Sequence, residues 1–323
     1  MVYNILLIGS GNVGSRHLQA LVKIPFKIQI DIIEPKKSAK ELSISRLNEI
    51  NYDEKTTLIV WHDLYNSKIP KSNVVIVATL SKGRSDLLNK LIMDGHTRIL
   101  SEKILCQSKS EFDKIIKTCK KYDAKVWVNT NPRCFASYKK LKKLIPKYSQ
   151  VNMIVNSNPE LGMGTNAIHY IDLFSWLNDN YDIKLDGAHL LDLLPNKRGK
   201  DFIEFSGTVI GILKNHAIFV MSFLDNYPKN ATVKISTNTF DFYVDETAGT
   251  LLQIKKNKYK SEKFTFEHVS SLTKKIVMDI ITSDSCCLPT ISESYDGHLE
   301  LFKIFNHHIF KKTKKRAHLC PIT

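Results

Sequence analysis

The sequence has 323 residues, a formal net charge of +15 and 43% hydrophobic residues. This length is enough for two domains, each with its own core. No apolar run approaches the roughly 20 residues that span a bilayer, and the first apolar segment begins too close to Met1 to leave room for a signal peptide. We therefore expect a cytoplasmic protein with no membrane partner.

The positive charge comes from lysines that are scattered along the chain. Aromatic residues do not alternate with them, as they do on surfaces that stack nucleic-acid bases. We interpret the excess charge as compositional bias, with an anionic substrate as a second interpretation, and we expect no nucleic-acid partner. The six cysteines show no Cys-x-x-Cys spacing and no nearby ligand partners, so we expect no metal site.

A glycine-rich loop follows the first predicted strand, the apolar run Ile5–Ile8. Its glycines have the Gly-x-Gly-x-x-Gly spacing, in which the first makes a tight turn, the second lets the backbone approach a pyrophosphate, and the third lets the next helix pack closely. The helix that follows would offer its amino-terminal N–H groups to phosphates. The loop therefore predicts a dinucleotide site that comprises Gly9, Ser10, Gly11, Asn12, Val13 and Gly14.

Glu34 closes the next predicted strand, Ile28–Ile33. A carboxylate at this place would bind the adenosine ribose hydroxyls and repel a 2′-phosphate, which favours NAD over NADP. Lys36 and Lys37 follow directly and could tolerate that phosphate, so NADP is not excluded.

Strands and helices then alternate up to residue 128, which predicts βαβ units and a parallel sheet. Ligands of such sheets bind at the carboxyl ends of the strands. We therefore expect a doubly wound Rossmann domain over residues 1–128. Its remaining elements are predicted as helix Ser38–Ile50, strand Thr57–Trp61, strand Asn73–Thr79, helix Ser85–Met93, strand Arg98–Leu100, helix Ser108–Lys121 and strand Ala124–Val128.

Beyond residue 128 the pattern changes to helices, then consecutive strands with short turns, then helices again. Consecutive strands of this kind predict an antiparallel sheet. We expect a second, α+β domain over residues 129–323 with an open, mostly antiparallel sheet, and a cleft between the domains. Its elements are predicted as helices Ser137–Ile145 and Asn166–Leu177, strands Phe202–Leu213, His216–Leu224, Ala231–Ser236, Phe240–Asp245 and Thr250–Lys255, and helices Leu272–Thr282 and Ile291–Phe310.

A Glu102–Lys103 pair follows the strand that ends at Leu100. A surface ion pair is the ordinary interpretation. The functional interpretation is that Lys103 points into the cleft, beside the nicotinamide ribose and the reacting hydroxyl.

Several motifs now occur in an order that resembles the glucose-fructose oxidoreductase/inositol dehydrogenase (Gfo/Idh/MocA) family. They are the glycine loop followed by Arg16-His17, Ala78-Thr79, Glu102-Lys103, Asn131-Pro132-Arg133, His169-Tyr170-Ile171-Asp172 and Leu288-Pro289-Thr290. The resemblance covers most of the chain. It implies an NAD(P)-dependent oxidoreductase whose second domain forms a homodimer or homotetramer. It also implies that Thr79, Leu80 and Glu102 lie at the cofactor.

The sequence departs from the family pattern at three places. Ile104 stands where the family has proline, so we expect a trans peptide bond before it, because a non-proline cis bond costs about 3 kcal/mol. Thr165 stands where the family has an acid one helical turn before the histidine. Arg84 or Lys82 replaces the histidine that is common after Ala-Thr. Such departures also occur in members that have lost catalysis.

On the helix that begins near Asn166, three polar residues share one face: Asn166, His169 and Asp172. A lone histidine here would be a packing residue. Because Lys103 and the glycine loop accompany it, we interpret His169 as the general acid/base. An ordinary histidine pKa of about 6.5 allows proton transfer in both directions of the reaction. Lys103 would stabilise negative charge on the reacting oxygen. Asn131, Arg133, Asn166 and Asp172 would hold the substrate.

Two functions follow. The first is hydride transfer to or from a hydroxyl or keto carbon of a sugar, possibly nucleotide-linked or acidic, in carbohydrate biosynthesis. The second is a dinucleotide-binding sensor or scaffold without turnover, which the missing proline and acid would favour.

Overall fold

The computed structural model describes residues 2–66, 68–147, 149–256 and 258–323. The chain folds into two compact units. The first unit consists of Met1–Cys106, Ser110–Asn129 and Glu267–Ser292, and the second consists of Gln107–Lys109, Thr130–Phe266 and Glu293–Thr323.

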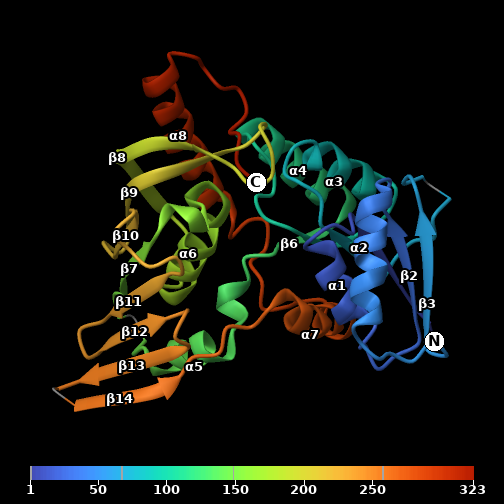
Figure 1. The fold of residues 1–323 in the computed structure, drawn as a ribbon, viewed down its shortest axis with the longest axis horizontal. Helices are drawn as coiled ribbons and strands as arrows, with labels where there is room; N and C mark the ends of the chain where they lie inside the picture. Colours follow the sequence, from blue (N-terminus) through green and yellow to red (C-terminus); the bar gives the residue numbers. More distant parts are fainter. Residues whose placement is uncertain (1, 67, 148, 257) are drawn as a thin grey trace. The chain divides into compact units, whose positions relative to one another are not determined.

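In the described part of the chain, the first unit holds a six-stranded parallel sheet with the order β3-β2-β1-β4-β5-β6 (Figure 1). This is the order of a dinucleotide-binding Rossmann sheet, as the sequence predicted. The strands are β1 (Tyr3–Ile8), β2 (Ile28–Ile33), β3 (Thr57–His62), β4 (Val74–Val77), β5 (Arg98–Ser101) and β6 (Lys125–Val128). The helices are α1 (Gly14–Leu21), α2 (Lys37–Asn48), α3 (Arg84–Met93), α4 (Lys109–Tyr122) and α7 (Val269–Ser283).

The centre of this sheet is apolar on both faces. The four residues of β4 are completely buried, and so are Ile5, Leu6 and Leu7 of β1. Continuous burial of this kind is expected where helices cover both faces of a parallel sheet. The carboxyl ends of β1 and β4 therefore lie at the edge of a fully packed sheet centre.

Helix α7 belongs to the first unit, although the sequence placed the whole region after residue 128 in the second domain. It packs beside α1, where Nδ1 of His17 lies 2.7 Å from Oγ1 of Thr273 (Figure 1). The segment after α7 also returns to the first sheet, because the N–H of Val128 donates to the carbonyl of Pro289 at 3.0 Å. These contacts join a segment distant in sequence to the Rossmann unit.

The second unit is built on an eight-stranded sheet with the order β14-β13-β12-β11-β7-β10-β9-β8 among the described residues. It is antiparallel except for the pair β7 and β10, which confirms the predicted open, mostly antiparallel sheet. The strands are β7 (Asn152–Ser157), β8 (Ile183–Pro195), β9 (Ile203–Leu213), β10 (Ile218–Phe223), β11 (Thr232–Ser236), β12 (Asp241–Asp245), β13 (Thr250–Lys255) and β14 (Lys258–Lys263). The helices are α5 (Ala136–Leu144), α6 (Met163–Leu177) and α8 (Tyr295–Thr313), with short 3-10 turns η1 (Asn131–Cys134) and η2 (Pro159–Leu161).

Aromatic side chains join the helices of this unit to one face of the sheet. Phe174 of α6 stacks on Phe219 of β10 with ring centres 5.3 Å apart, and Phe305 of α8 stacks on Phe205 of β9 at 4.0 Å. Aromatic pairs of this type add to the energy of burial. The Phe174–Phe219 pair thereby holds the carboxyl-terminal part of α6 against the sheet.

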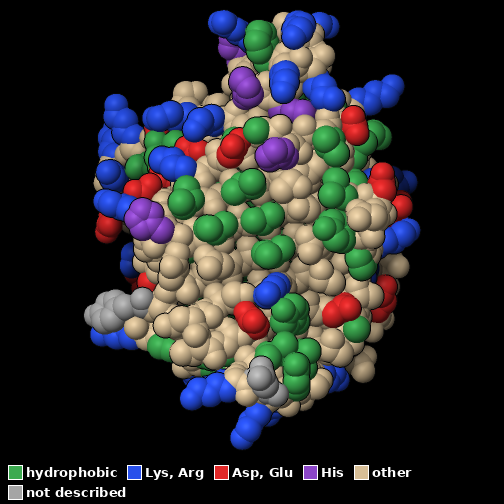
Figure 2. All heavy atoms as spheres, turned by 90° about the vertical axis from the view of Figure 1, so that its left-hand side faces the viewer, with side chains coloured by type: hydrophobic (Ala, Val, Ile, Leu, Met, Phe, Trp, Pro, Cys, Tyr) green, Lys and Arg blue, Asp and Glu red, His purple; other side chains and the backbone are tan. Residues whose placement is uncertain are grey.

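The opposite face of the sheet carries exposed apolar side chains (Figure 2). Ile154 of β7, Ile210 and Ile212 of β9 and Ile218 of β10 are each between 37% and 48% exposed. The strand register places Ile212 opposite Ile218 and Ile210 opposite Val220. We call these five side chains the open-face patch. In the part of the chain that is described, no helix is both long and apolar enough to cross a membrane.

Candidate cofactor and active site

The glycine loop has the geometry that its spacing predicts. Gly9 has φ +85° and its N–H donates to the carbonyl of Ile33 at 2.9 Å. A Cβ on Gly14 would lie 1.9 Å from the carbonyl oxygen of Gly9, so no larger residue fits there. A Cβ on Gly11 would meet nothing within 4 Å. The loop is therefore packed tightly at its base and open above Gly11, which fits the approach of a pyrophosphate.

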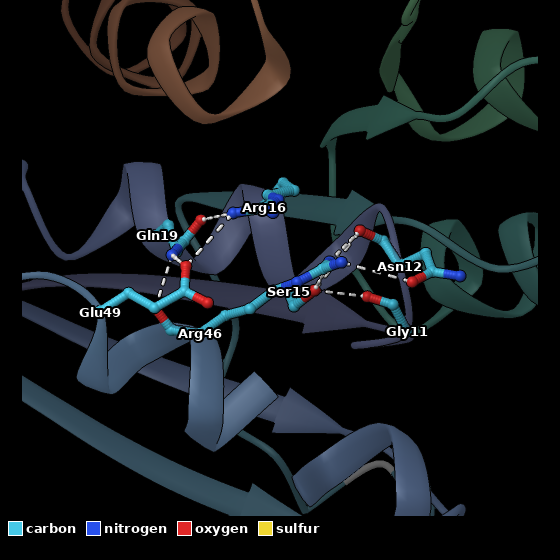
Figure 3. A network of polar contacts seen from close by, with 7 residues as sticks. All are labelled: Gly11, Asn12, Ser15, Arg16, Gln19, Arg46 and Glu49. Carbon is cyan, nitrogen blue, oxygen red and sulfur yellow. Dashed lines mark hydrogen bonds and ion pairs between the residues drawn. The ribbon is translucent and has the colours of Figure 1, made fainter. Parts of the chain in front are cut away.

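Arg46 of α2 holds this loop from the side (Figure 3). Its guanidinium donates to the carbonyl of Asn12 and to Oγ of Ser15, both at 2.6 Å. Ser15 in turn donates to the carbonyl of Gly11 at 2.7 Å. Partial burial and the nearby charge of Arg16 lower the pKa of Arg46. Arg46 was not predicted as a site residue, because no sequence motif connects a helix residue to a loop 34 positions earlier.

Glu34 lies at the same loop, as predicted. Its Oε2 accepts from the N–H of Ser10 at 2.7 Å, and its Oε1 accepts from the N–H of Lys36 at 3.0 Å. The side chain is 7% exposed. The carboxylate thus joins the end of β2 to the glycine loop, at the place where a Rossmann domain binds the adenosine ribose.

Arg84, at the start of α3, is 1% exposed and binds three backbone carbonyls. Its guanidinium donates to Glu102 at 2.6 Å and also to Ile104 and Thr79. It therefore connects the segment after β4 with the segment after β5. From the sequence, Arg84 was only a replacement for a histidine, and this role in joining the two segments was not predicted.

Lys103 lies just after β5 and is 6% exposed. The peptide bond between Lys103 and Ile104 is cis, so the expectation of a trans bond was wrong. The preceding residue, Glu102, is buried, and Oε1 of its carboxylate lies 3.1 Å from Nε2 of His17 and accepts from Nδ2 of Asn129 at 2.5 Å. Glu102 is therefore an interior residue of the first unit and not a surface ion-pair partner.

Burial by itself would raise the pKa of Glu102, but its hydrogen bond with His17 and the charge of His17 lower it to about 2. The hydrogen bond from Asn129 and the charge of Lys103 act in the same direction. The carboxylate is thus held ionised beside the predicted catalytic lysine.

The predicted substrate residues lie in the second unit. Arg133 of η1 and Asp172 of α6 bind each other, with Nη1 and Oδ1 3.3 Å apart, and both are buried. Burial raises the pKa of Asp172 to about 6, against the opposing effect of the Arg133 charge. Asn166 donates to the carbonyl of Leu161 at 2.6 Å, and Asn131 is partly exposed in η1.

His169 is partly buried on α6 in the second unit, whereas Lys103 is part of the first. Their convergence at one nicotinamide ring remains a prediction.

Thr165 of α6, which stands in place of the expected acid, binds a carboxylate from strand β9. Its hydroxyl donates to Oε1 of Glu204, and its N–H donates to Oε2 at 3.2 Å. Glu204, on β9, is 6% exposed. A single carboxylate inside the apolar run of β9 was a signal in the sequence, but its partner 39 positions earlier was not predictable.

The first unit therefore has the fold, the glycine loop and the strand-end carboxylate of a dinucleotide-binding domain. These features define the class of NAD(P)-dependent oxidoreductases. Residues 3–130 match the model of the GFO_IDH_MocA family, described as an oxidoreductase family with an NAD-binding Rossmann fold. The match covers the N-terminal part of the chain and is to the NAD-binding domain of the Gfo/Idh/MocA oxidoreductases, so the cofactor is of the NAD type. No curated protein sequence matches the chain.

Solved structures resemble the chain over nearly its whole length. An oxidoreductase from Agrobacterium radiobacter in complex with NAD+, L-tartaric acid and magnesium has a TM-score of 0.72 at 12% identity, and the match covers 98% of both chains. UDP-N-acetylglucosamine 3-dehydrogenase from Acidithiobacillus ferrooxidans has a TM-score of 0.67 at 12% identity, covering 94% of this chain and 99% of that one. A Gfo/Idh/MocA family oxidoreductase from Vibrio cholerae has a TM-score of 0.69 at 14% identity, covering 97% and 100%. At these identities the likeness shows the fold of both units.

Proposed function

We propose that this oxidoreductase acts on a hydroxyl or keto carbon of a sugar, possibly nucleotide-linked or acidic, in carbohydrate biosynthesis. The observation that carries the proposal is the glycine loop, which is closed at Gly14, open above Gly11 and matched by the NAD-binding family model. Among structures of the same fold, one is a UDP-N-acetylglucosamine 3-dehydrogenase and another holds L-tartaric acid. Both compounds carry hydroxylated carbons, which supports this substrate class.

In this proposal a nicotinamide cofactor, when bound, would supply the hydride chemistry. His169 takes the proton from the substrate hydroxyl, or returns it in the reverse direction. Lys103 donates a hydrogen bond to the reacting oxygen and stabilises the negative charge that develops there. Glu102 positions the lysine segment, because its carboxylate is fixed by His17 and Asn129. Gly9 to Gly14, Glu34, Thr79 and Leu80 hold the cofactor.

For the substrate, we propose that Asn131 and Asn166 bind hydroxyl groups. Arg133 and Asp172 form a buried ion pair, and removing either partner would leave the other charge buried and unpaired, at a cost of several kcal/mol. We therefore propose that these two support the site by fixing η1 against α6.

We also propose that the open-face patch joins two copies of this chain into a homodimer, or two dimers into a homotetramer. Exposed isoleucines that are adjacent across β9 and β10 form a continuous apolar surface. Contiguous apolar surface of this kind is characteristic of protein–protein contacts.

The catalytic roles are tested by Lys103→Ala and His169→Ala, each assayed with NAD and a panel of sugars, with NADH binding measured by fluorescence. We expect a turnover loss of at least 100-fold in both variants, with NADH affinity within threefold of the unchanged protein. Lys125→Ala, which removes an exposed lysine on β6, is the matched control. Unchanged turnover in both active-site variants would discard the assignment.

The alternative, a dinucleotide-binding sensor or scaffold, is favoured by Thr165, which leaves α6 without its usual acid. It predicts that the unchanged protein binds NADH and oxidises or reduces no sugar in the same panel.

A further inference from the structure

A pocket of about 520 Å³ lies at the amino end of α6, entirely within the second unit. Its walls come from the segment before α6, from the end of β8 and the chain between β8 and β9, from the start of β9, and from Asp225 after β10. Thr165, Asn196 and Glu204 line its buried part, and Lys197 and Arg198 line its exposed part. We call this hollow the α6 pocket.

Glu204 is the buried charge of the α6 pocket. Besides the two hydrogen bonds from Thr165, its Oε1 accepts from Nδ2 of Asn196 at 2.7 Å. The N–H groups and the dipole at the start of a helix favour a negative group. The carboxylate is therefore oriented by three donors from two elements, and the side chain still faces the pocket.

The backbone leaves room for this carboxylate. Gly162, just before α6, has φ +85°, and a Cβ on it would lie 2.8 Å from Oε1 of Glu204. Any larger residue would displace the carboxylate from the helix end.

Two cationic side chains stand on the exposed side of the pocket. Lys197 donates from Nζ to the carbonyl of Glu160 at 3.2 Å, and Arg198 follows it. The carboxylate of Glu160 itself is paired with Lys229 at 2.9 Å. Lys197 and Arg198 therefore provide positive charge beside a pocket whose interior accepts hydrogen bonds.

We infer that the α6 pocket binds the hydroxylated ring of a sugar with an anionic substituent, an inference that rests on the proposed function. Ring hydroxyls would donate to Glu204, since an ionised carboxylate only accepts hydrogen bonds. Lys197 and Arg198 would meet a phosphate or carboxylate on the ring. Glu204 thus supplies from β9 the acidic group that α6 lacks at Thr165.

Calorimetric titration of the NADH-saturated protein with UDP-N-acetylglucosamine, D-glucuronate and myo-inositol tests this inference. We expect at least one of the two anionic sugars to bind, and Glu204→Gln to weaken that binding by at least tenfold. The double variant Lys197→Ala/Arg198→Ala changes only exposed residues. It should weaken the binding of each anionic sugar that the unchanged protein binds by at least fivefold, and leave any affinity for myo-inositol within twofold.

The matched control is Asp179→Asn, which makes the same carboxylate-to-amide change beyond the far end of α6. It should bind every sugar as the unchanged protein does. Failure of both anionic sugars to bind, or an anionic-sugar affinity within twofold of the unchanged protein for either pocket variant, would overturn the inference. NADH affinity is measured on the unchanged protein and on each variant. If the unchanged protein does not bind NADH, that result contradicts the proposed cofactor function and not the sugar site.

Discussion

His17 and Glu102 meet in the interior of the first unit, with Nε2 of the histidine 3.1 Å from Oε1 of the carboxylate. The histidine comes from α1, directly after the glycine loop, and the carboxylate follows β5, directly before Lys103. One buried contact therefore connects the predicted phosphate-binding loop to the predicted catalytic lysine. Thr273 of α7 holds the other ring nitrogen of His17 at 2.7 Å.

The first prediction concerns Glu102→Gln. The pKa of Glu102 is lowered from 4.5 to about 2 in the folded protein, so its stabilising effect is complete above about pH 4.5 and is lost as the pH falls through 2. At about 1.4 kcal/mol per tenfold change in proton affinity, the effect is at most about 3 kcal/mol. We expect the variant to lose up to this amount of unfolding free energy at pH 7 and clearly less at pH 3.

Urea unfolding at both pH values provides the measurement. Glu41→Gln is the control, because its exposed pair with Lys37 contributes little to stability. A difference between Glu102→Gln and the unchanged protein that does not vary with pH would contradict the ionised, positioned carboxylate.

The second prediction compares two glycines of the same loop. Gly14→Ala would place its Cβ 1.9 Å from the Gly9 carbonyl oxygen, and we expect a stability loss of about 1–3 kcal/mol or more from this overpacking. Gly11→Ala has open space around its Cβ, so its thermal midpoint should not fall. Its NADH affinity should still fall by at least tenfold, because the methyl group occupies the approach of the pyrophosphate. Normal NADH binding by Gly11→Ala would place the cofactor elsewhere.

The elements that the sequence predicted correctly are those with a strong local pattern. The apolar runs of β1 and β4 and the glycine loop needed no information from distant residues. Three strands of the second sheet, β7, β8 and β14, were not predicted. β14 reads Lys-Tyr-Lys-Ser-Glu-Lys at the sheet edge, and β8 contains irregularities after Asp186 and Leu190 that break its alternation.

In the candidate site, too, only residues with a local sequence pattern were predicted. Glu34 was found because the end of β2 and the glycine loop have a fixed relationship in this fold. Arg46, Arg84 and Glu204 each make a contact with a backbone or side-chain group that is 18 to 39 positions away. Side chains of this kind can be assigned only when the elements that carry them are placed in space.

The third prediction concerns Arg84→Met. Removing the guanidinium leaves the carbonyls of Thr79, Glu102 and Ile104 without this donor in the interior, and an unsatisfied buried group costs about 1–3 kcal/mol. We expect a loss of at least about 3 kcal/mol of unfolding free energy and weaker NADH binding. Arg98→Met is the control, because Arg98 pairs with Asp284 at a half-exposed position and should cost about 1 kcal/mol or less. Equal small losses would show that Arg84 does not organise this edge.

The fourth prediction tests the open-face patch. Ile210→Lys/Ile218→Lys places two charges on adjacent strands without putting them opposite each other. Light scattering after size-exclusion chromatography should show an oligomer for the unchanged protein and a monomer for this variant, because charge at the centre of an apolar contact opposes association. Leu58→Lys/Leu64→Lys makes the same charge change at exposed positions of the first unit and should remain oligomeric. A monomeric unchanged protein would contradict the proposed interface.

The fifth prediction concerns Glu246, which accepts hydrogen bonds from the hydroxyls of Tyr138 at 3.3 Å and Tyr170 at 3.2 Å. Burial raises the pKa of Glu246 from 4.5 to about 7, against the opposing effect of the two tyrosines. A raised carboxyl pKa contributes stability that is complete below about pH 4.5 and is lost as the pH rises through 7. The glutamine of Glu246→Gln cannot ionise. From pH 4 to pH 8, the unfolding free energy of the variant should therefore rise relative to that of the unchanged protein by up to about 3 kcal/mol. Urea unfolding at these two pH values measures this change, and Glu54→Gln at an exposed position is the control. If the difference in unfolding free energy between variant and unchanged protein does not grow with rising pH, Glu246 is not held protonated by its surroundings.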